Sequence, residues 1–83
     1  MGKPVKIYAL STCIYCQNTK AFFKQNGVFY ECVDVDLLDE TEKTATLRKI
    51  RKLVPSVVFP TILIGDEIVQ GYKPDVLRKL LNL

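Results

Sequence analysis

The sequence predicts an α/β fold in which a four-stranded mixed sheet carries helices on both faces. Short β-branched, apolar runs alternate with longer segments of helical character, in the order β-α-β-α-β-β-α. The opening strand–helix–strand unit requires a parallel pair with a right-handed crossover. A tight turn at Gly65-Asp66 joins the last two strands into an antiparallel hairpin. We therefore expect one domain, residues 1–83.

The composition is that of a soluble globular protein, with 48% hydrophobic and 25% charged residues. A net charge of +3 is too small to indicate nucleic-acid binding, although it favours anionic small molecules or acidic protein partners. Met1 to Lys6 lack the apolar region of a secretory signal, and the most apolar stretch, Leu53 to Ile64, is too short to span a bilayer. We expect a cytoplasmic monomer that binds neither nucleic acid nor membranes.

The first strand is predicted over Val5–Leu10, where β-branched and apolar residues cluster. Ser11-Thr12 interrupts it. Helical character then runs from Ile14 to Asn26, and Gly27 provides a C-terminal stop. The apolar side of this helix is expected to consist of Ala21, Phe22 and Phe23.

The second strand is predicted over Phe29–Asp36. Asp39, with Glu42 three residues later, forms a capping-box-like start for a second helix that runs to about Lys52. The core side of this helix is expected to carry Leu47, Ile50 and Val54.

The C-terminal third is predicted to form two short strands and a helix. The strands are Thr61–Ile64 and Glu67–Gln70, and Pro74 fits the first turn of the closing helix. The apolar residues expected to face inward from this helix are Val76, Leu77, Leu80 and Leu81.

Cys13 and Cys16 are the residues that most clearly indicate chemistry. Cys13 opens the first helix, where unpaired amides and the peptide dipoles stabilise a thiolate over a thiol. Cys16, one turn further in, is expected to be less exposed and close enough to form a disulfide with it. These positions predict Cys13 as the attacking thiol and Cys16 as the thiol that resolves a mixed disulfide.

Two other interpretations of the cysteine pair stay open. C-x-x-C is often half of a zinc site, but histidine is absent and Cys32 is the only further thiol, so we expect no metal. The second interpretation is that the two cysteines form an inert buried pair. Cys32 lies mid-strand, where a free cysteine behaves as a small apolar residue, and we expect it to be structural.

Phe59-Pro60-Thr61 is the second chemical clue. Proline is tolerated at the first residue of a strand and is the residue for which a cis peptide costs little. A cis Pro60 opposite the cysteines would leave the amide and carbonyl of Phe59 unpaired and ready to bind an extended thiol substrate. The alternative is that Pro60 simply begins the strand in trans, and spacing alone does not decide.

These segments together resemble the glutaredoxin family, in order and in separation, over nearly the whole chain. The resemblance implies the thioredoxin fold, a cis Pro60, Cys13 as nucleophile, no tightly bound cofactor, and electrons supplied by glutathione or a thioredoxin-type system. The segments that carry it are Ser11-Thr12-Cys13-Ile14-Tyr15-Cys16, Val58-Phe59-Pro60-Thr61, Ile64-Gly65 and Gly71.

The chain departs from the usual family pattern at three places. Ile14 stands where proline commonly follows the first cysteine, and retains an amide that proline would remove. Leu10 stands where many members carry a cation that would contact a glutathione carboxylate. Gly71-Tyr72-Lys73-Pro74-Asp75 is similar instead to the hydrogen donors of ribonucleotide reductase, which accept electrons from thioredoxin reductase.

We therefore expect a thiol–disulfide oxidoreductase that reduces protein or glutathione-mixed disulfides, with glutathione as co-substrate. The alternative is a dedicated electron carrier to a partner such as ribonucleotide reductase, reduced by thioredoxin reductase. A module that binds a metal or cluster through Cys13 of two chains is a third possibility, disfavoured because Cys16 is retained. The residues expected to contact substrate are Tyr15, Phe59, Pro60, Gly71 and Tyr72.

Three further features have competing interpretations. Tyr15 could pack its ring on a substrate or be an ordinary first-turn residue. Lys20 could add positive potential near Cys16, but we expect it to face solvent. A group of cations at the end of the second helix either complements the helix dipole, the interpretation we favour, or forms a docking patch for an acidic partner. Its members are Arg48, Lys49, Arg51 and Lys52.

Overall fold

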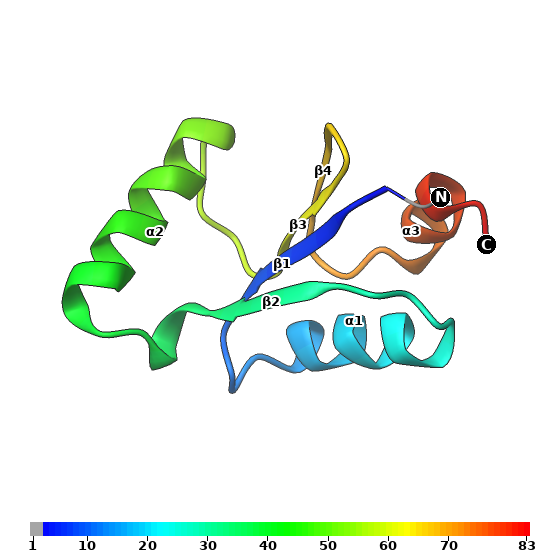
Figure 1. Ribbon diagram of the computed structural model, residues 1–83, viewed down its shortest axis with the longest axis horizontal. Coiled ribbons are helices and arrows are strands. Elements are labelled where there is room, and N and C mark those ends of the chain that lie inside the picture. The colour runs from blue at the N-terminus through cyan, green and yellow to red at the C-terminus, as the bar shows by residue number, and fades with distance from the viewer. Residues whose placement is uncertain (1–2) are drawn as a thin grey trace.

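A computed structural model describes residues 3–83 as four strands and three α-helices in the predicted order (Figure 1). The first two residues, which contributed to the expectation that no secretory signal is present, lie outside the described part. The strands are β1 (Val5–Ala9), β2 (Glu31–Asp34), β3 (Thr61–Ile64) and β4 (Glu67–Gln70). The helices are α1 (Ile14–Gln25), α2 (Glu40–Leu53) and α3 (Pro74–Leu81), with a 3-10 turn η1 (Val35–Leu37) after β2.

The strands form one mixed sheet in the order β2-β1-β3-β4. β1 pairs in parallel with β2, with Ile7 opposite Cys32. β1 is antiparallel to β3, with Ile7 opposite Ile62, and β3 is antiparallel to β4, with Ile62 opposite Val69. The predicted parallel pair and the predicted C-terminal hairpin are both confirmed. Together with the three helices, they give the thioredoxin-like arrangement expected from the sequence.

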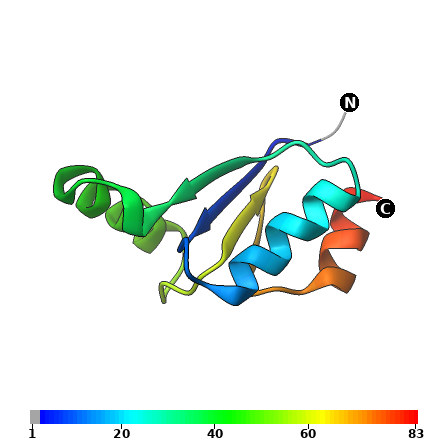
Figure 2. The ribbon, with the colours of Figure 1, turned by 90° about the horizontal axis from the view of Figure 1, so that it is seen from below.

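Helices cover both faces of the sheet, as predicted (Figure 2). Successive side chains of a strand point to opposite faces, so Ile7 packs into the core beneath α1 and α3, whereas Tyr8 packs into the core beneath α2. Phe23 and Leu77 fill the first core, and Ile50 fills the second. None of the helices within residues 3–83 combines the length and the apolar character needed to cross a membrane.

The predicted helix signals act as expected, with small shifts in the boundaries. The Asp39 carboxylate caps α2 by accepting a hydrogen bond from the Glu42 amide at 2.8 Å. Gly27 has a positive φ of 66° just beyond the end of α1. β1 ends at Ala9, and the predicted second strand is shortened at its end because Val35–Leu37 form the 3-10 turn.

Three predicted core or strand positions are wrong. Phe29 is 96% exposed and precedes β2, because the Val28 amide bonds to the Phe23 carbonyl at 2.9 Å and prolongs the turn that follows α1. Ala21 is exposed because the buried stripe of α1 follows helical spacing through Thr19 and Phe22 to Phe23.

Val76 is the third such position, and is 41% exposed. The eight-residue helix α3 presents a narrow apolar side, on which Leu77 is fully buried and Leu80 is partly buried. Val76 lies one residue before Leu77, about 100° around the helix, and falls outside that side. Ile50 of α2 and Val54, the residue just after its end, are buried as expected, and Leu47 packs at the margin of the same core.

Candidate active site

The loop after β1 places Cys13 at the N-cap of α1. The Cys13 amide donates to the Leu10 carbonyl at 3.1 Å, and the residue has an extended backbone with φ −82° and ψ 121°. Its Sγ accepts a hydrogen bond from the Cys16 amide at 3.4 Å. The sulfur thus occupies the place of the side-chain oxygen that usually caps a helix. One of the otherwise unpaired amides of the first turn points at it.

The surroundings of Cys13 favour its thiolate. Burial raises the pKa of the Cys13 thiol, but hydrogen bonds from the Cys16 thiol and from the Cys16 and Tyr15 amides together lower it below the ordinary value of 9.0. The partial positive charge at the start of α1 acts in the same direction. Since the thiolate is the nucleophilic form, these surroundings favour nucleophilic reactivity at Cys13.

Cys16 has the opposite environment. Its side chain is fully buried in the core that also contains Phe22 and Phe23. Burial above all, and then the hydrogen bond to Cys13, raise the pKa of the Cys16 thiol to about 12. Cys13, Cys16 and Cys32 are all free thiols in this structure. Two adjacent thiols whose pKa values are moved apart can take different roles in one reaction.

The Phe59-Pro60 peptide bond is cis and comes immediately before β3, so the prediction of a cis Pro60 is confirmed. The Cys13 thiol donates a hydrogen bond to the Phe59 carbonyl at 3.9 Å. We expected the Phe59 carbonyl to be unpaired. This expectation is wrong for the dithiol form of the protein, in which both Cys13 and Cys16 are free thiols. The contact places the proline segment beside Sγ of Cys13.

Gly71 connects the end of β4 to the same segment. Its amide donates to the Pro60 carbonyl at 2.8 Å, and its φ is +89°. The Gln70 amide group reinforces this connection by donating to Thr61 Oγ1 at 3.3 Å and to the Ser56 carbonyl at 2.9 Å. The backbone around Pro60 is therefore held from one side by the end of β4.

The remaining predicted contact residues occupy different surroundings. Tyr15 and its neighbour Ile14 are each 60% exposed at the start of α1. Tyr72 is half-buried and, like Cys13 and Phe59, packs against the main core. The structure therefore places the Cys13 thiol beside the proline segment, with the exposed side chains of Ile14 and Tyr15 at the start of the same helix.

Two polar links near the cysteines were missed or misjudged from the sequence. Lys20 does not simply face solvent as expected, because its Nζ lies 2.9 Å from Oδ1 of Asp34. The Ser11 amide donates to Asp36 Oδ1 at 2.9 Å, and its hydroxyl donates to Asp36 Oδ2. Each link joins residues separated along the chain, and no local pattern marks either of them.

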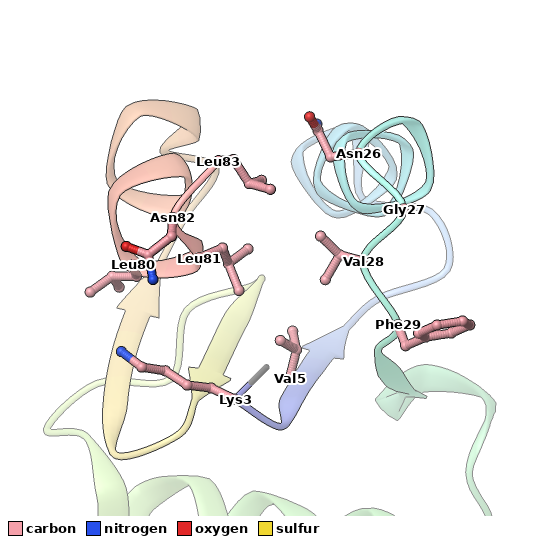
Figure 3. A pocket seen from close by; sticks show the side chains of 10 residues that line it. All are labelled: Lys3, Val5, Asn26, Gly27, Val28, Phe29, Leu80, Leu81, Asn82 and Leu83. Atoms are coloured by element: carbon pink, nitrogen blue, oxygen red, sulfur yellow. The ribbon is translucent and has the colours of Figure 1, made fainter. Parts of the chain in front are cut away.

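A cavity of about 500 Å³ lies at the end of the sheet where β1 begins (Figure 3). It is lined by residues from the start of β1 and the ends of α1 and α3, among them Val5, Val28 and Leu81. Figure 3 shows Val28 pointing into this space and Phe29 pointing away from it. β1 runs from this end toward Cys13, so the cavity takes no part in the candidate site. Within residues 3–83, no three His, Cys, Asp or Glu side chains gather as metal ligands.

Comparisons with known proteins agree with this geometry. The Glutaredoxin family model matches residues 5–69. The glutaredoxin-like protein NrdH of Salmonella typhimurium is 29% identical over 76 residues, covering 92% of this chain and 86% of that protein. The crystal structure of Methanosarcina acetivorans methanoredoxin has a TM-score of 0.92 at 35% identity, covering 98% of this chain and 86% of that one. The NrdH-redoxin of Escherichia coli, a glutaredoxin-like protein with a thioredoxin-like activity profile, has a TM-score of 0.72 at 26% identity over 93% of both chains.

Proposed function

The chain belongs to the glutaredoxin family of thiol–disulfide oxidoreductases, and from that premise we propose that it reduces disulfides through Cys13 as attacking thiol and Cys16 as resolving thiol. The observation that carries the proposal is the 3.4 Å hydrogen bond from the Cys16 amide to Cys13 Sγ. It stabilises charge on one sulfur, while the second sulfur stays buried and protonated one helical turn away.

The reaction then proceeds in two exchanges. The Cys13 thiolate attacks one sulfur of the substrate disulfide, which forms a mixed disulfide and expels the other sulfur as a thiolate. Cys16 loses its proton to solvent and attacks Sγ of Cys13. The Cys13–Cys16 disulfide forms, the bond to the substrate breaks, and the second substrate thiolate takes up a proton. Two electrons pass from the protein to the substrate.

We assign substrate contacts to the residues that surround Cys13. The Phe59 carbonyl accepts a hydrogen bond only while the Cys13 thiol is protonated, so ionisation of Cys13 frees it for an amide of an extended substrate. The Tyr15 ring, exposed beside the sulfur, is available to pack on the substrate. The contact surface is completed by Pro60, Gly71 and Tyr72.

A second candidate function is that of a dedicated electron carrier to a protein partner such as ribonucleotide reductase. Supporting it are the Gly71–Asp75 segment and the similarity to an NrdH protein. Leu10 also favours it, because this half-buried apolar side chain provides no charge for a glutathione carboxylate. In this case thioredoxin reductase, rather than glutathione, would reduce the Cys13–Cys16 disulfide.

A paired reduction assay tests both candidates. The oxidised protein is mixed with a disulfide substrate and NADPH, together with glutathione and glutathione reductase in one arm and with thioredoxin reductase in the other, and consumption of NADPH is followed. Cys13→Ser is expected to abolish turnover with either donor, and Cys16→Ser is expected to spare any route that needs a single thiol. Cys32→Ser is the matched control and should leave turnover unchanged.

The two donors separate the candidates. Fast turnover with thioredoxin reductase alone would favour the dedicated carrier, and fast turnover with glutathione would favour the general reductase. Full activity of Cys13→Ser with either donor would refute the assigned mechanism.

A further inference from the structure

Lys20 lies on α1 one helical turn beyond the buried Cys16, so both residues lie on the same side of the helix. Its ammonium is fixed there by Asp34, the last residue of β2, at 2.9 Å. Both side chains of this pair are only 25% exposed. Asp34 is in register with Ala9 at the end of β1, the strand that leads to Cys13. The ion pair therefore lies at the cysteine end of the sheet.

Cys32 further limits the freedom of this pair. Its Sγ donates to the same Asp34 oxygen at 3.7 Å. A lysine at an exposed position samples many conformations, whereas here the carboxylate holds the ammonium against the sheet. Lys24, one turn further along α1, is exposed and forms no ion pair within residues 3–83.

We propose that Lys20, held in place by Asp34, stabilises the thiolate of Cys16 in the mixed disulfide and so accelerates the resolving step. The inference rests on the proposed function, since it concerns the second exchange of that reaction. In the dithiol form, burial above all keeps Cys16 protonated, and the hydrogen bond and the charge of Cys13 add to this effect. Once Cys13 is bonded to substrate, its sulfur carries no charge, and the two contributions from Cys13 disappear while burial remains.

The groups that then face Cys16 are few. Burial raises the pKa of the Cys16 thiol most, while a backbone hydrogen bond at Leu10 and the charge of Lys20 lower it. Asp34, paired with Lys20 at 2.9 Å, offsets part of its charge. Lys20 is thus the one side chain among these groups that favours loss of the Cys16 proton. That proton passes to solvent, and Cys16 Sγ then displaces the substrate thiolate from Cys13.

A single-turnover experiment separates the two exchanges. The reduced protein is mixed with one equivalent of an aromatic disulfide whose thiolate product absorbs visible light. The first phase reports attack by Cys13, and the second, which is independent of concentration, reports attack by Cys16 and release of the second aromatic thiolate. Both rate constants are measured as a function of pH.

Lys20→Gln is expected to slow the second phase and to move its pH midpoint upward, with the first phase unchanged. Each unit of rise in the pKa of Cys16 lowers its thiolate fraction about tenfold at neutral pH, and the more basic thiolate regains roughly threefold in nucleophilicity. The expected net loss is therefore roughly threefold for each unit. Lys20→Arg, which keeps the charge, should recover most of the rate.

Two further variants distinguish an electrostatic role from a structural one. Lys24→Gln removes the same charge one turn away and should change neither phase. Asp34→Asn keeps an oxygen to accept from Lys20 but removes the opposing charge, so the second phase should not slow. Equal slowing in Lys20→Gln and Asp34→Asn would mean that the pair only ties α1 to β2, and an unchanged second phase in Lys20→Gln would overturn the inference. A wild-type protein with no second phase would refute the dithiol mechanism itself.

Discussion

The Cys16 amide donates a hydrogen bond to Cys13 Sγ at 3.4 Å, so one residue supplies both the buried thiol and a donor to the half-buried sulfur of Cys13. The bond forms because Cys13 occupies the N-cap, where its extended backbone directs the side chain back over the first turn. The same turn therefore polarises one thiol and holds the second thiol next to it. The predicted reactivity depends on this arrangement more than on any cavity.

The first prediction concerns the reactivity of the individual thiols. In the native protein, alkylation of Cys13 should show a pH midpoint below 9.0, because hydrogen bonds at the start of α1 outweigh the effect of burial on its pKa. Cys16 should resist alkylation because it is fully buried. Mass spectrometry after limited reaction with iodoacetamide at a series of pH values measures both. As a control, Cys13 and Cys16 should be alkylated at similar rates in urea. Faster alkylation of Cys16 than of Cys13 in the native protein would contradict the roles assigned to the two thiols.

The second prediction concerns Ile14, at the first position of α1. Proline suits this position, and Cys13 before it already has the extended backbone that proline requires. The amides that bond to Cys13 Sγ belong to Tyr15 and Cys16, and both survive the change. Ile14→Pro should therefore leave the alkylation midpoint of Cys13 unchanged and alter the free energy of unfolding by no more than about 1 kcal/mol.

Ile14→Ala serves as the control for loss of the exposed side chain. An upward shift of the Cys13 midpoint in Ile14→Pro, with none in Ile14→Ala, would show that the Ile14 amide stabilises the thiolate. The isoleucine would then be a determinant of reactivity rather than a neutral replacement.

The order of elements was predictable because each one has its own local signal. Asp39 and Glu42 mark the start of α2, Pro74 marks the start of α3, and short β-branched, apolar runs mark the strands. Errors arose where burial depends on distant partners. Phe29 has strong strand propensity, but it is exposed and precedes β2, because the Val28 amide bonds to the Phe23 carbonyl and prolongs the turn after α1.

The candidate site was predictable in part for the same reason. The position of Cys13 at a helix start and of Pro60 before a strand follows from nearby residues. The partners of Lys20 and Ser11 do not, because Asp34 and Asp36 lie 14 and 25 residues away. Their side chains meet only after β1 and β2 have paired, and a single sequence does not report such contacts.

A third prediction concerns Gly71, whose φ of +89° disfavours any residue with a Cβ atom. Within residues 3–83, no atom other than those of Gly71 and its two chain neighbours lies within 4 Å of the position a Cβ would occupy, so the cost of Gly71→Ala comes from backbone strain alone. We expect a loss of about 1–2 kcal/mol in the free energy of unfolding. Activity should also fall, because the Gly71 amide bonds to the Pro60 carbonyl beside the thiol.

Gly27→Ala is a matched control for this change. Gly27 also has a positive φ and open space around it, but it lies at the far end of α1 from Cys13. Gly27→Ala should lower the free energy of unfolding by a similar amount, measured by urea unfolding, and should leave disulfide reduction intact. Equal loss of activity in the two variants would show that Gly71 matters only for stability.

A fourth prediction concerns the link between Ser11 and Asp36, which ties the loop before Cys13 to the turn after β2. The Ser11 hydroxyl first, and its amide second, lower the pKa of the Asp36 carboxyl below 3.8. A carboxyl whose pKa is depressed on folding stabilises the protein at pH values above its unfolded pKa, and the stabilisation is lost as pH falls through the folded pKa. Ser11→Ala should therefore be less stable than the wild type at pH 7, and this difference should shrink below pH 3.8.

Urea unfolding at neutral pH and at about pH 3 measures this difference, with the midpoint of each curve as the readout. Thr12→Ala changes the exposed neighbouring residue and serves as a control. Its stability difference should not depend on pH in this way, because within residues 3–83 the Asp36 carboxylate is hydrogen-bonded by Ser11 and not by Thr12. A stability difference between Ser11→Ala and the wild type that persists unchanged at acid pH would mean that the serine acts independently of the Asp36 charge. The loop that positions Cys13 would then be held by other contacts. In that case the pH midpoint for alkylation of Cys13 should be the same in Ser11→Ala as in the wild type.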